Sequence, residues 1–262
     1  MRNSTGWAAL RGYTFIVYGF VYLPIMLMGL FSLNSSDMIT FPLTGFTLDW
    51  YNQILHDGRI FKGLLTTFSV AFPVTIITTV FGSMAAIVLT RHKFKGKMLF
   101  LALLVLPFFV PKLIFAIAQV TFLNDIGLNK GLYTIWISQS MIILPFVTVI
   151  IASVLFRVDK RLEEAAGDLG ATPWQTFRRV TLPLMKNGIL AGSFISFVLS
   201  NAEYTVSYFT SGRAQPLSVL VASDFRFHLS PTLNALAMLI VLFNMLIIVI
   251  SEWFRRRGVQ PE

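Results

Sequence analysis

The sequence predicts an all-α integral membrane protein of six transmembrane helices, with one long polar segment between the fourth and fifth helices. Of its 262 residues, 55% are hydrophobic and only 13% are charged. Such a chain carries more apolar surface than one soluble core can bury. Apolar stretches of about 20 residues, the length that crosses a bilayer, recur along it. We expect residues 1–262 to form a single transmembrane domain.

The six spans are the apolar stretches that lie between clusters of charge. Four of the stretches, residues 12–36, 63–90, 131–156 and 227–251, contain no Asp, Glu, Lys or Arg, and the other two are each interrupted by one charge, Lys112 or Glu203. The first stretch follows basic residues, as a secretory signal does, but it is long and no small-residue cleavage pattern follows it. We therefore expect it to remain as a span. The predicted spans are residues 13–33, 66–90, 98–122, 132–156, 188–209 and 233–254.

Lys and Arg are distributed unequally between alternate loops. The two terminal segments, the 91–97 turn and the 157–186 segment together hold 15 of them, whereas the three opposite loops hold 5. Because cytoplasmic loops of membrane proteins carry an excess of Lys and Arg, both termini are predicted to be cytoplasmic. An even number of spans agrees with this orientation.

The external segment after the first span, residues 34–62, contains signals for a short helix. Thr47 or Asp49 is placed to cap its N-terminus. Trp50 and Tyr51 follow at once, and their amphipathic rings favour the headgroup region of the bilayer. We expect an interfacial helix here.

Prolines interrupt the middle spans. Pro107 and Pro111 predict a broken or kinked third span, and Pro145 lies near the centre of the fourth. Irregular backbone at membrane depth is tolerated where it lines a cavity or packs against protein. This pattern favours a transporter over a simple membrane anchor.

The polar segment, residues 157–187, begins with a predicted helix through KRLEEAAGDL. Asp159 is placed to cap its start, and Gly170 lies where a residue in the left-handed conformation ends a helix. This glycine predicts an elbow in the chain.

A second helix is expected to follow the elbow. Thr172, Pro173 and Gln175 fit the N-cap, the first helical position and the third helical position of a capping box. Pro183 is expected to end this helix. The segment would thus present two short amphipathic helices on the cytoplasmic side.

The sequence EAAGDLGATPWQTFRRVTLP resembles the signature of one family, the membrane subunits of binding-protein-dependent ABC importers with the type I permease fold. The family pattern is Glu-Ala-Ala, three residues, Gly, nine residues, an apolar residue that is commonly Ile, one residue, then Leu-Pro. This chain departs from it only in having Val180 at the apolar position. The matching residues are Glu164, Ala165, Ala166, Gly170, Val180, Leu182 and Pro183.

The resemblance implies that residues 157–187 form a coupling segment that docks in a cleft of an ATP-binding subunit. Closure of the ATPase would then push on the spans as rigid bodies. Glu164 would supply a polar contact, the two alanines would allow close approach, and Gly170 would form the elbow. The implied coupling residues are Glu164, Ala165, Ala166, Asp168, Gly170, Pro173, Trp174, Leu182 and Pro183.

The resemblance also implies the partners of the chain. These are an ABC ATPase dimer, a second homologous permease subunit or a second copy of this chain, a periplasmic or lipid-anchored solute-binding protein, and membrane lipid. The location would be the bacterial plasma (inner) membrane. An excess of basic residues in a membrane chain reflects its orientation, and nucleic acid is not an expected partner.

The chain is not expected to be an enzyme. It has no Gly-rich phosphate-binding loop, so ATP and Mg are expected on the partner ATPase and no cofactor on this chain. There are no cysteines, and the three histidines, His56, His92 and His228, lack metal-ligand spacing. No catalytic or metal site is therefore predicted.

Within the family, the chain looks most like the polyamine branch. The phrases TLDWY, EEAAGDLGAT, SFVLS and SPTLNALAMLI carry this likeness. Two positions depart from it: polyamine permeases tend to have an acid after the proline of the third span and two acids after Leu-Ser in the fifth. Here Lys112 follows Pro111, and LSNAEY retains only Glu203.

Ionisable groups at membrane depth are costly and usually face a cavity or a partner. We therefore expect a translocation pathway with Lys112, Asn201, Glu203 and Tyr204, suited to a polyamine-like solute or to a zwitterionic or carboxylate-bearing amine. Two alternatives stay open for the charges, which could pair only structurally or, for Lys112, extend to the interface. The alternative function is a six-span channel or an ion-coupled carrier.

Overall fold

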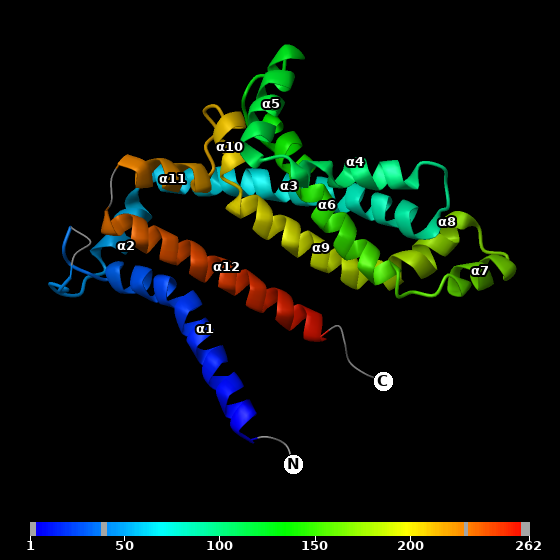
Figure 1. The fold of residues 1–262 in the computed structure, drawn as a ribbon. Coiled ribbons are helices and arrows are strands. Elements are labelled where there is room, and N and C mark those ends of the chain that lie inside the picture. Colours follow the sequence, from blue (N-terminus) through cyan, green and yellow to red (C-terminus); the bar gives the residue numbers. More distant parts are fainter. Residues whose placement is uncertain (1–3, 38–40, 228–229, 258–262) are drawn as a thin grey trace. The chain divides into compact units, whose positions relative to one another are not determined.

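The computed structural model describes residues 4–37, 41–227 and 230–257, and the regular secondary structure in these residues is helical apart from one isolated β-bridge. Figure 1 shows the helices in chain order. They are α1 Ser4–Phe31, α2 Asp49–His56, α3 Gly58–Arg91, α4 Lys97–Phe109, α5 Lys112–Asp125, α6 Leu132–Leu155, α7 Arg161–Asp168, α8 Pro173–Thr176, the π-helix η1 Phe177–Thr181, α9 Leu182–Ala202, α10 Thr205–Thr210, α11 Leu217–Phe227 and α12 Pro231–Arg257.

The chain divides into two units. One comprises Met1–Phe61 with Val221–Ile250, and the other comprises Lys62–Leu220 with Ser251–Glu262. Each unit has its own internal packing. The prediction that residues 1–262 act as a single domain stays a prediction.

In the first unit, Trp50 holds the segment after α1 to helix α2. Its Nε1 donates to the Asn34 carbonyl at 2.7 Å, and the residue is only 8% exposed. An antiparallel bridge between Asn34 and Phe46 orders this segment next to the indole, and the prediction that Trp50 lies in the headgroup region stays a prediction. Of the two predicted caps of α2, Thr47 accepts the Asp49 N–H at 3.1 Å.

Asp57 caps the start of α3 in the same unit. Its carboxylate accepts the Arg59 backbone N–H at 2.8 Å and the Arg59 Nη2 at 3.1 Å. The side-chain hydrogen bond from Arg59 lowers the pKa of the Asp57 carboxyl, against a smaller opposite effect of burial. An ionised Asp57 also suits the positive end of the helix dipole.

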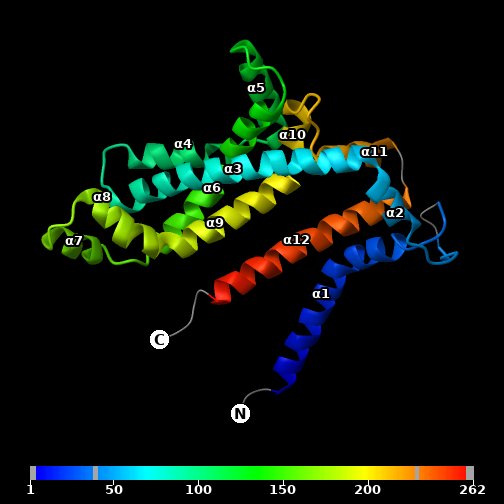
Figure 2. The ribbon, with the colours of Figure 1, turned by 180° about the vertical axis from the view of Figure 1, so that it is seen from behind.

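The core of the second unit lies between α3, α6 and α9, which run side by side in Figures 1 and 2. Buried residues of α3 and α9 pack on both sides of α6, whose Val147 and Ile151 are fully buried. Glycines allow α3 and α9 to lie this close to α6. A Cβ at Gly82 would lie 2.9 Å from Val147 Cγ1, and one at Gly192 would lie 3.1 Å from the same atom. Helices in membranes pack closely in this way through small residues.

The predicted break in the third span is confirmed. α4 and α5 meet at an angle of 108°. Pro111 lies between them as the N-terminal flanking residue of α5. Its missing N–H and its effect on the preceding residue prevent a continuous helix. In contrast, α6 continues through Pro145.

The predicted span 188–209 is wrong as one continuous helix. α9 ends at Ala202, and α10 begins at Thr205. The backbone of Glu203 is extended, and its Oε1 accepts the Val206 N–H at 3.1 Å, which starts a new helix. The carboxylate therefore accounts for the break.

Four helices in the described part of the chain are long and apolar enough to cross a membrane, and the bent α4–α5 pair makes a fifth candidate. The apolar part of α12 in the described residues, Pro231–Leu246, is shorter. The prediction of six spans stays a prediction. The four long candidates are Leu10–Phe31, Gly58–Arg91, Leu132–Leu155 and Pro173–Ala202.

Candidate functional site

Two regions of the second unit contain the residues singled out in the sequence. Figures 1 and 2 show α7 and α8 at one end of the bundle formed by α3, α6 and α9, and α5 and α10 at the other. The coupling segment, residues 157–187, is at the first end. The paired charges of the third and fifth spans are near the second.

Helix α7 has the predicted beginning and end. Asp159 Oδ1 accepts the Arg161 N–H at 3.0 Å. Gly170 has φ +83°, its N–H donates to Gly167, and the Ala171 N–H donates to Ala166. These two backbone bonds form a Schellman motif, which needs a left-handed residue that glycine adopts at little cost. The glycine elbow is confirmed.

The start of α8 is also as predicted. Gln175 N–H donates to Thr172 Oγ1 at 3.4 Å, and the Thr172 N–H donates to Gln175 Oε1 at 2.9 Å. Pro173 occupies the first helical position, where a missing N–H costs nothing. The capping box therefore sets the direction in which the chain leaves the elbow.

The prediction that Pro183 ends this helix is wrong. The chain continues from α8 through the π-helix η1 into α9, so Pro173–Ala202 forms one candidate span. Leu182 N–H donates to the Phe177 carbonyl, a bond across five residues. Pro183 lies at the start of α9, where it needs no donor. The wider turn of η1 thus accommodates the proline.

Most predicted coupling residues are exposed on the surface of this segment. Leu169 is 89% exposed and Trp174 is 67% exposed, and the Trp174 ring lies 5.5 Å from that of Phe177. Ala166 is half-buried. The predicted coupling residues that are exposed are Glu164, Ala165, Asp168, Gly170, Pro173, Trp174, Leu182 and Pro183.

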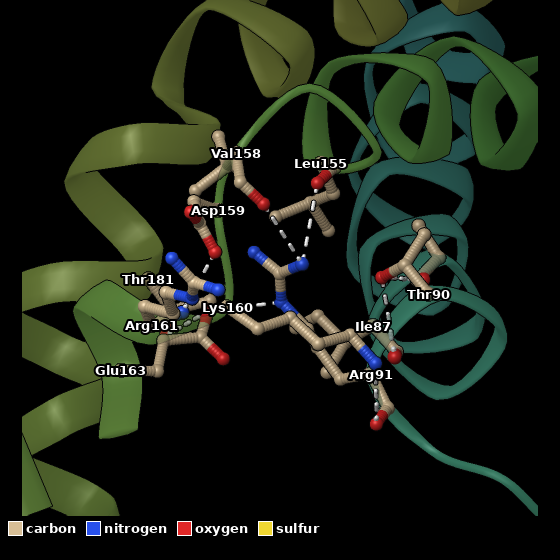
Figure 3. A network of polar contacts seen from close by, with 11 residues as sticks. Ile87, Thr90, Arg91, Leu155, Val158, Asp159, Lys160, Arg161, Glu163 and Thr181 are labelled. Atoms are coloured by element: carbon tan, nitrogen blue, oxygen red, sulfur yellow. Dashed lines mark hydrogen bonds and ion pairs between the residues drawn. The ribbon is translucent and has the colours of Figure 1, made fainter. Parts of the chain in front are cut away.

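Sequence reasoning missed Arg91 and Glu163, which hold the coupling segment to the spans. Arg91 is the last residue of α3, and its Nε donates to Glu163 Oε1 at 3.0 Å (Figure 3). The only sequence signal was a pair of adjacent acids, Glu163 and Glu164. The structure separates their roles, because Glu163 is mostly buried whereas Glu164 is exposed.

Lys112 and Glu203 form an ion pair, which fits both the pathway prediction and the alternative of a purely structural pair. Lys112 Nζ lies 2.8 Å from Glu203 Oε2, and the two side chains are 59% and 7% exposed. They line a cavity of about 160 Å³ together with apolar residues that include Pro107, Phe108 and Phe146. A buried carboxylate and a more accessible ammonium in one apolar cavity can bind an amine and an acid group.

The other two predicted pathway residues are placed differently. Asn201 Nδ2 donates to the Phe197 carbonyl of its own helix at 2.7 Å. Tyr204 follows Glu203 in the break, and its ring lies 5.6 Å from that of Tyr208. Neither residue is among those that line the cavity of Lys112 and Glu203.

Gln139 is a further residue that sequence reasoning missed. Its Oε1 accepts the Ser200 hydroxyl at 2.5 Å, and its Nε2 donates to Ser207 Oγ at 2.8 Å. Ser207 in turn donates to the Glu203 carbonyl at 2.9 Å. α6 therefore fixes both sides of the α9–α10 break. A signal was present in the polar run 138–140 inside an apolar span.

In the described part of the chain, no group of three or more His, Cys, Asp or Glu residues could hold a metal ion. His56 and His92 are exposed at helix ends. His228 lies outside the described residues. The described residues thus contain a bundle of helices, the coupling segment and a cavity lined by an ion pair.

Comparison with protein families decides the class. The family described as binding-protein-dependent transport system inner membrane component matches residues 78–259, which is more than half of the chain. The chain belongs to this family. It is a multi-pass permease of the inner membrane, and in this family the ATPase is a separate subunit. The alternative of a channel or ion-coupled carrier is thereby set aside.

Relatives support the same class over nearly the whole permease. It is 28% identical to the spermidine/putrescine transport system permease protein PotC of Haemophilus influenzae, covering 95% of this chain and 96% of that protein. It is 32% identical to the putrescine transport system permease protein PotI of Escherichia coli K12, covering 86% of this chain and 82% of that protein. The permease is therefore a subunit of a binding-protein-dependent ABC importer.

The fold has been seen in a solved importer. The permease resembles a chain of a bacterial alginate ABC transporter in complex with an alginate pentasaccharide-bound periplasmic protein. The TM-score is 0.73 at 16% identity, covering 98% of this chain and 95% of that chain. The architecture is the type I importer permease fold.

Proposed function

We propose that residues 157–187 of the permease dock on a separate ABC ATPase and that the cavity of Lys112 and Glu203 belongs to the translocation pathway. The observation that carries the first part is the capped elbow of α7 and α8, which exposes apolar and charged side chains yet continues without a break into α9. An exposed Leu and Trp among charges suit a protein partner. Glu164, Asp168, Gly170, Pro173 and Trp174 form the docking surface.

The complete importer would contain this chain as one half of the membrane pathway. A second homologous permease subunit, or another copy, forms the other half, with an ATPase dimer on the cytoplasmic side and a solute-binding protein outside. In this arrangement the whole chain acts as one domain with six spans and cytoplasmic termini.

Orientation is tested by labelling single cysteines, because the natural chain has none. We expect Asp168→Cys, exposed on α7, to react with a membrane-impermeant maleimide only after the cells are permeabilised. Asn129→Cys, exposed in the loop between α5 and α6, should react in intact cells and serves as the matched control. Labelling of position 168 in intact cells would overturn the orientation and the docking proposal with it.

The solute is proposed to be a small amine, either a polyamine or an amine that also carries a carboxylate. The buried Glu203 carboxylate suits an ammonium group, and Lys112 suits a carboxylate. Relatives named for putrescine and spermidine support an amine. A solute with both groups would replace the internal ion pair with two matching pairs.

Native mass spectrometry of the cognate solute-binding protein, released from cells without dialysis, tests the solute class. We expect a bound ligand with at least one amine, because the Glu203 carboxylate of the proposed pathway suits an ammonium group. The same protein after unfolding and refolding is the ligand-free control. A bound neutral sugar or inorganic anion would contradict the proposal.

A further inference from the structure

Arg91 lies where three helical elements of the second unit come together. It is the last residue of α3, and its side chain is only 8% exposed. Nε donates to Glu163 Oε1 at 3.0 Å, and Nη1 donates to the carbonyls of Leu155 and Val158, each at 3.3 Å (Figure 3). Leu155 is the last residue of α6. One guanidinium therefore joins the ends of α3 and α6 to the first turn of α7.

Glu163 extends the same network to the start of the fifth span. Its Oε1 also accepts the Thr181 hydroxyl at 3.1 Å. Thr181 is buried and is the last residue of η1, directly before α9. In addition, Lys160 Nζ donates to the Arg91 carbonyl at 3.4 Å. The carboxylate thus connects α7 with both α3 and the base of α9.

The chemistry of the pair suits a rigid joint. A guanidinium offers several donors in a fixed plane, so it can bind a carboxylate and two carbonyls at once, which a lysine ammonium on a flexible stem does less well. Both charges are largely removed from water, so loss of either leaves an uncompensated buried charge. The pair therefore resists separation when α7 is pushed.

The two adjacent acids of the coupling segment face different surroundings. Glu163 contacts Arg91 and Thr181 inside the protein, whereas Glu164 is exposed on the surface proposed for docking. In addition, Arg91 Nη2 is buried without a hydrogen-bond partner among the described residues.

We propose that Arg91 and Glu163 are positioning residues that make α7 and the adjoining ends of α3, α6 and α9 move as one body. Force applied by the ATPase to α7 then reaches three spans at once. The ion pair itself touches neither ATP nor solute. This inference rests on the proposed docking of residues 157–187 on the ATPase.

The test uses the complete importer in lipid nanodiscs, with its ATPase, its partner permease and the solute-binding protein as purified from cells. The variants are Arg91→Gln, Glu163→Gln and the double variant. The control is Lys93→Gln, which removes an exposed positive charge from the 91–97 turn. Three quantities are measured: the ATPase that co-purifies, the melting temperature, and the stimulation of MgATP hydrolysis by the binding protein.

We expect the single variants to retain the ATPase but to lose stimulation by about fivefold or more, the range of ordinary coupling between sites. The double variant leaves no buried charge unpaired, so its melting temperature should recover toward wild type while its stimulation stays low. Lys93→Gln should keep full stimulation. Recovery of stability and stimulation together in the double variant would show a merely structural pair and overturn the proposal.

Failure of the docking proposal has a different signature. In the otherwise natural chain, Asp168→Cys labelled with a short maleimide–diazirine reagent should form photo-crosslinks to the ATPase, because the diazirine needs no cysteine on the partner. Absence of these crosslinks would refute docking. If Arg91→Gln retains the crosslinks and full stimulation, the proposed positioning role of Arg91 and Glu163 is refuted and the docking proposal is not.

Discussion

In the variant Gly170→Val, we expect the amount of ATPase that co-purifies with the permease to fall by at least about fivefold. Gly170 has φ +83°, and residues with a side chain pay about 1–2 kcal/mol for this conformation, β-branched ones most. An energy of that size changes an equilibrium by about 5- to 30-fold. No atom lies within 4 Å of the position of an added Cβ, so the effect is one of backbone conformation and not of a clash.

Two substitutions provide the controls for this experiment. Gly170→Asn should retain most of the ATPase, because asparagine adopts the left-handed region more readily than other side chains. Gly167→Ala lies in α7 without a positive φ or a close neighbour and should behave as wild type. The measurement is the ratio of ATPase to permease after affinity purification. Equal ratios for valine and asparagine would show that the left-handed conformation at position 170 is not needed for docking.

Lys112→Met and Glu203→Gln are each expected to lower uptake of the solute found on the binding protein by about tenfold or more. Lys112→Met leaves a carboxylate that is 7% exposed without its cation, a state that buried sites disfavour strongly. Glu203→Gln removes the charge but keeps an oxygen that can accept the Val206 N–H, so α10 should still form. Uptake is measured with radiolabelled solute in proteoliposomes.

The double variant distinguishes a role of the ion pair in transport from a role in stability alone. Lys112→Met with Glu203→Gln removes both charges, so the assembled complex should return to wild-type amounts while uptake stays low. Lys95→Met, an exposed lysine in the turn between α3 and α4, is the control for loss of a positive charge. If the double variant transports at the wild-type rate, the ion pair is structural and the cavity is not part of the pathway.

Features governed by neighbours in the sequence were predictable. The elbow at Gly170, the capping box of Thr172 and Gln175, and the break at Pro111 each depend on residues within about five positions. In each of these patterns the residues themselves favour the backbone conformation that the structure has, so the structure matches the prediction. The start of α7 at Asp159 was located in the same way.

Features that depend on distant partners were not predictable from patterns alone. The Arg91–Glu163 pair joins residues 72 positions apart, and the Gln139–Ser200 bond joins residues 61 apart. The buried contact of Trp50 was missed because nothing local shows that a carbonyl 16 residues away accepts its N–H. Pro183 was misjudged for a different reason: a π-helical turn before a proline leaves no simple sequence mark.

α8, η1 and α9 form one continuous helical segment that connects the coupling segment with the cavity of Lys112 and Glu203. The segment Pro173–Ala202 has 30 residues, which corresponds to about 45 Å at 1.5 Å per residue. A tilt of about 5° at the docking end would move the far end by about 4 Å. That end adjoins Glu203, whose bond to Lys112 Nζ is 2.8 Å long. If residues 157–187 dock on the ATPase as proposed, a rotation of that size is large enough, on geometry alone, to separate these two charges.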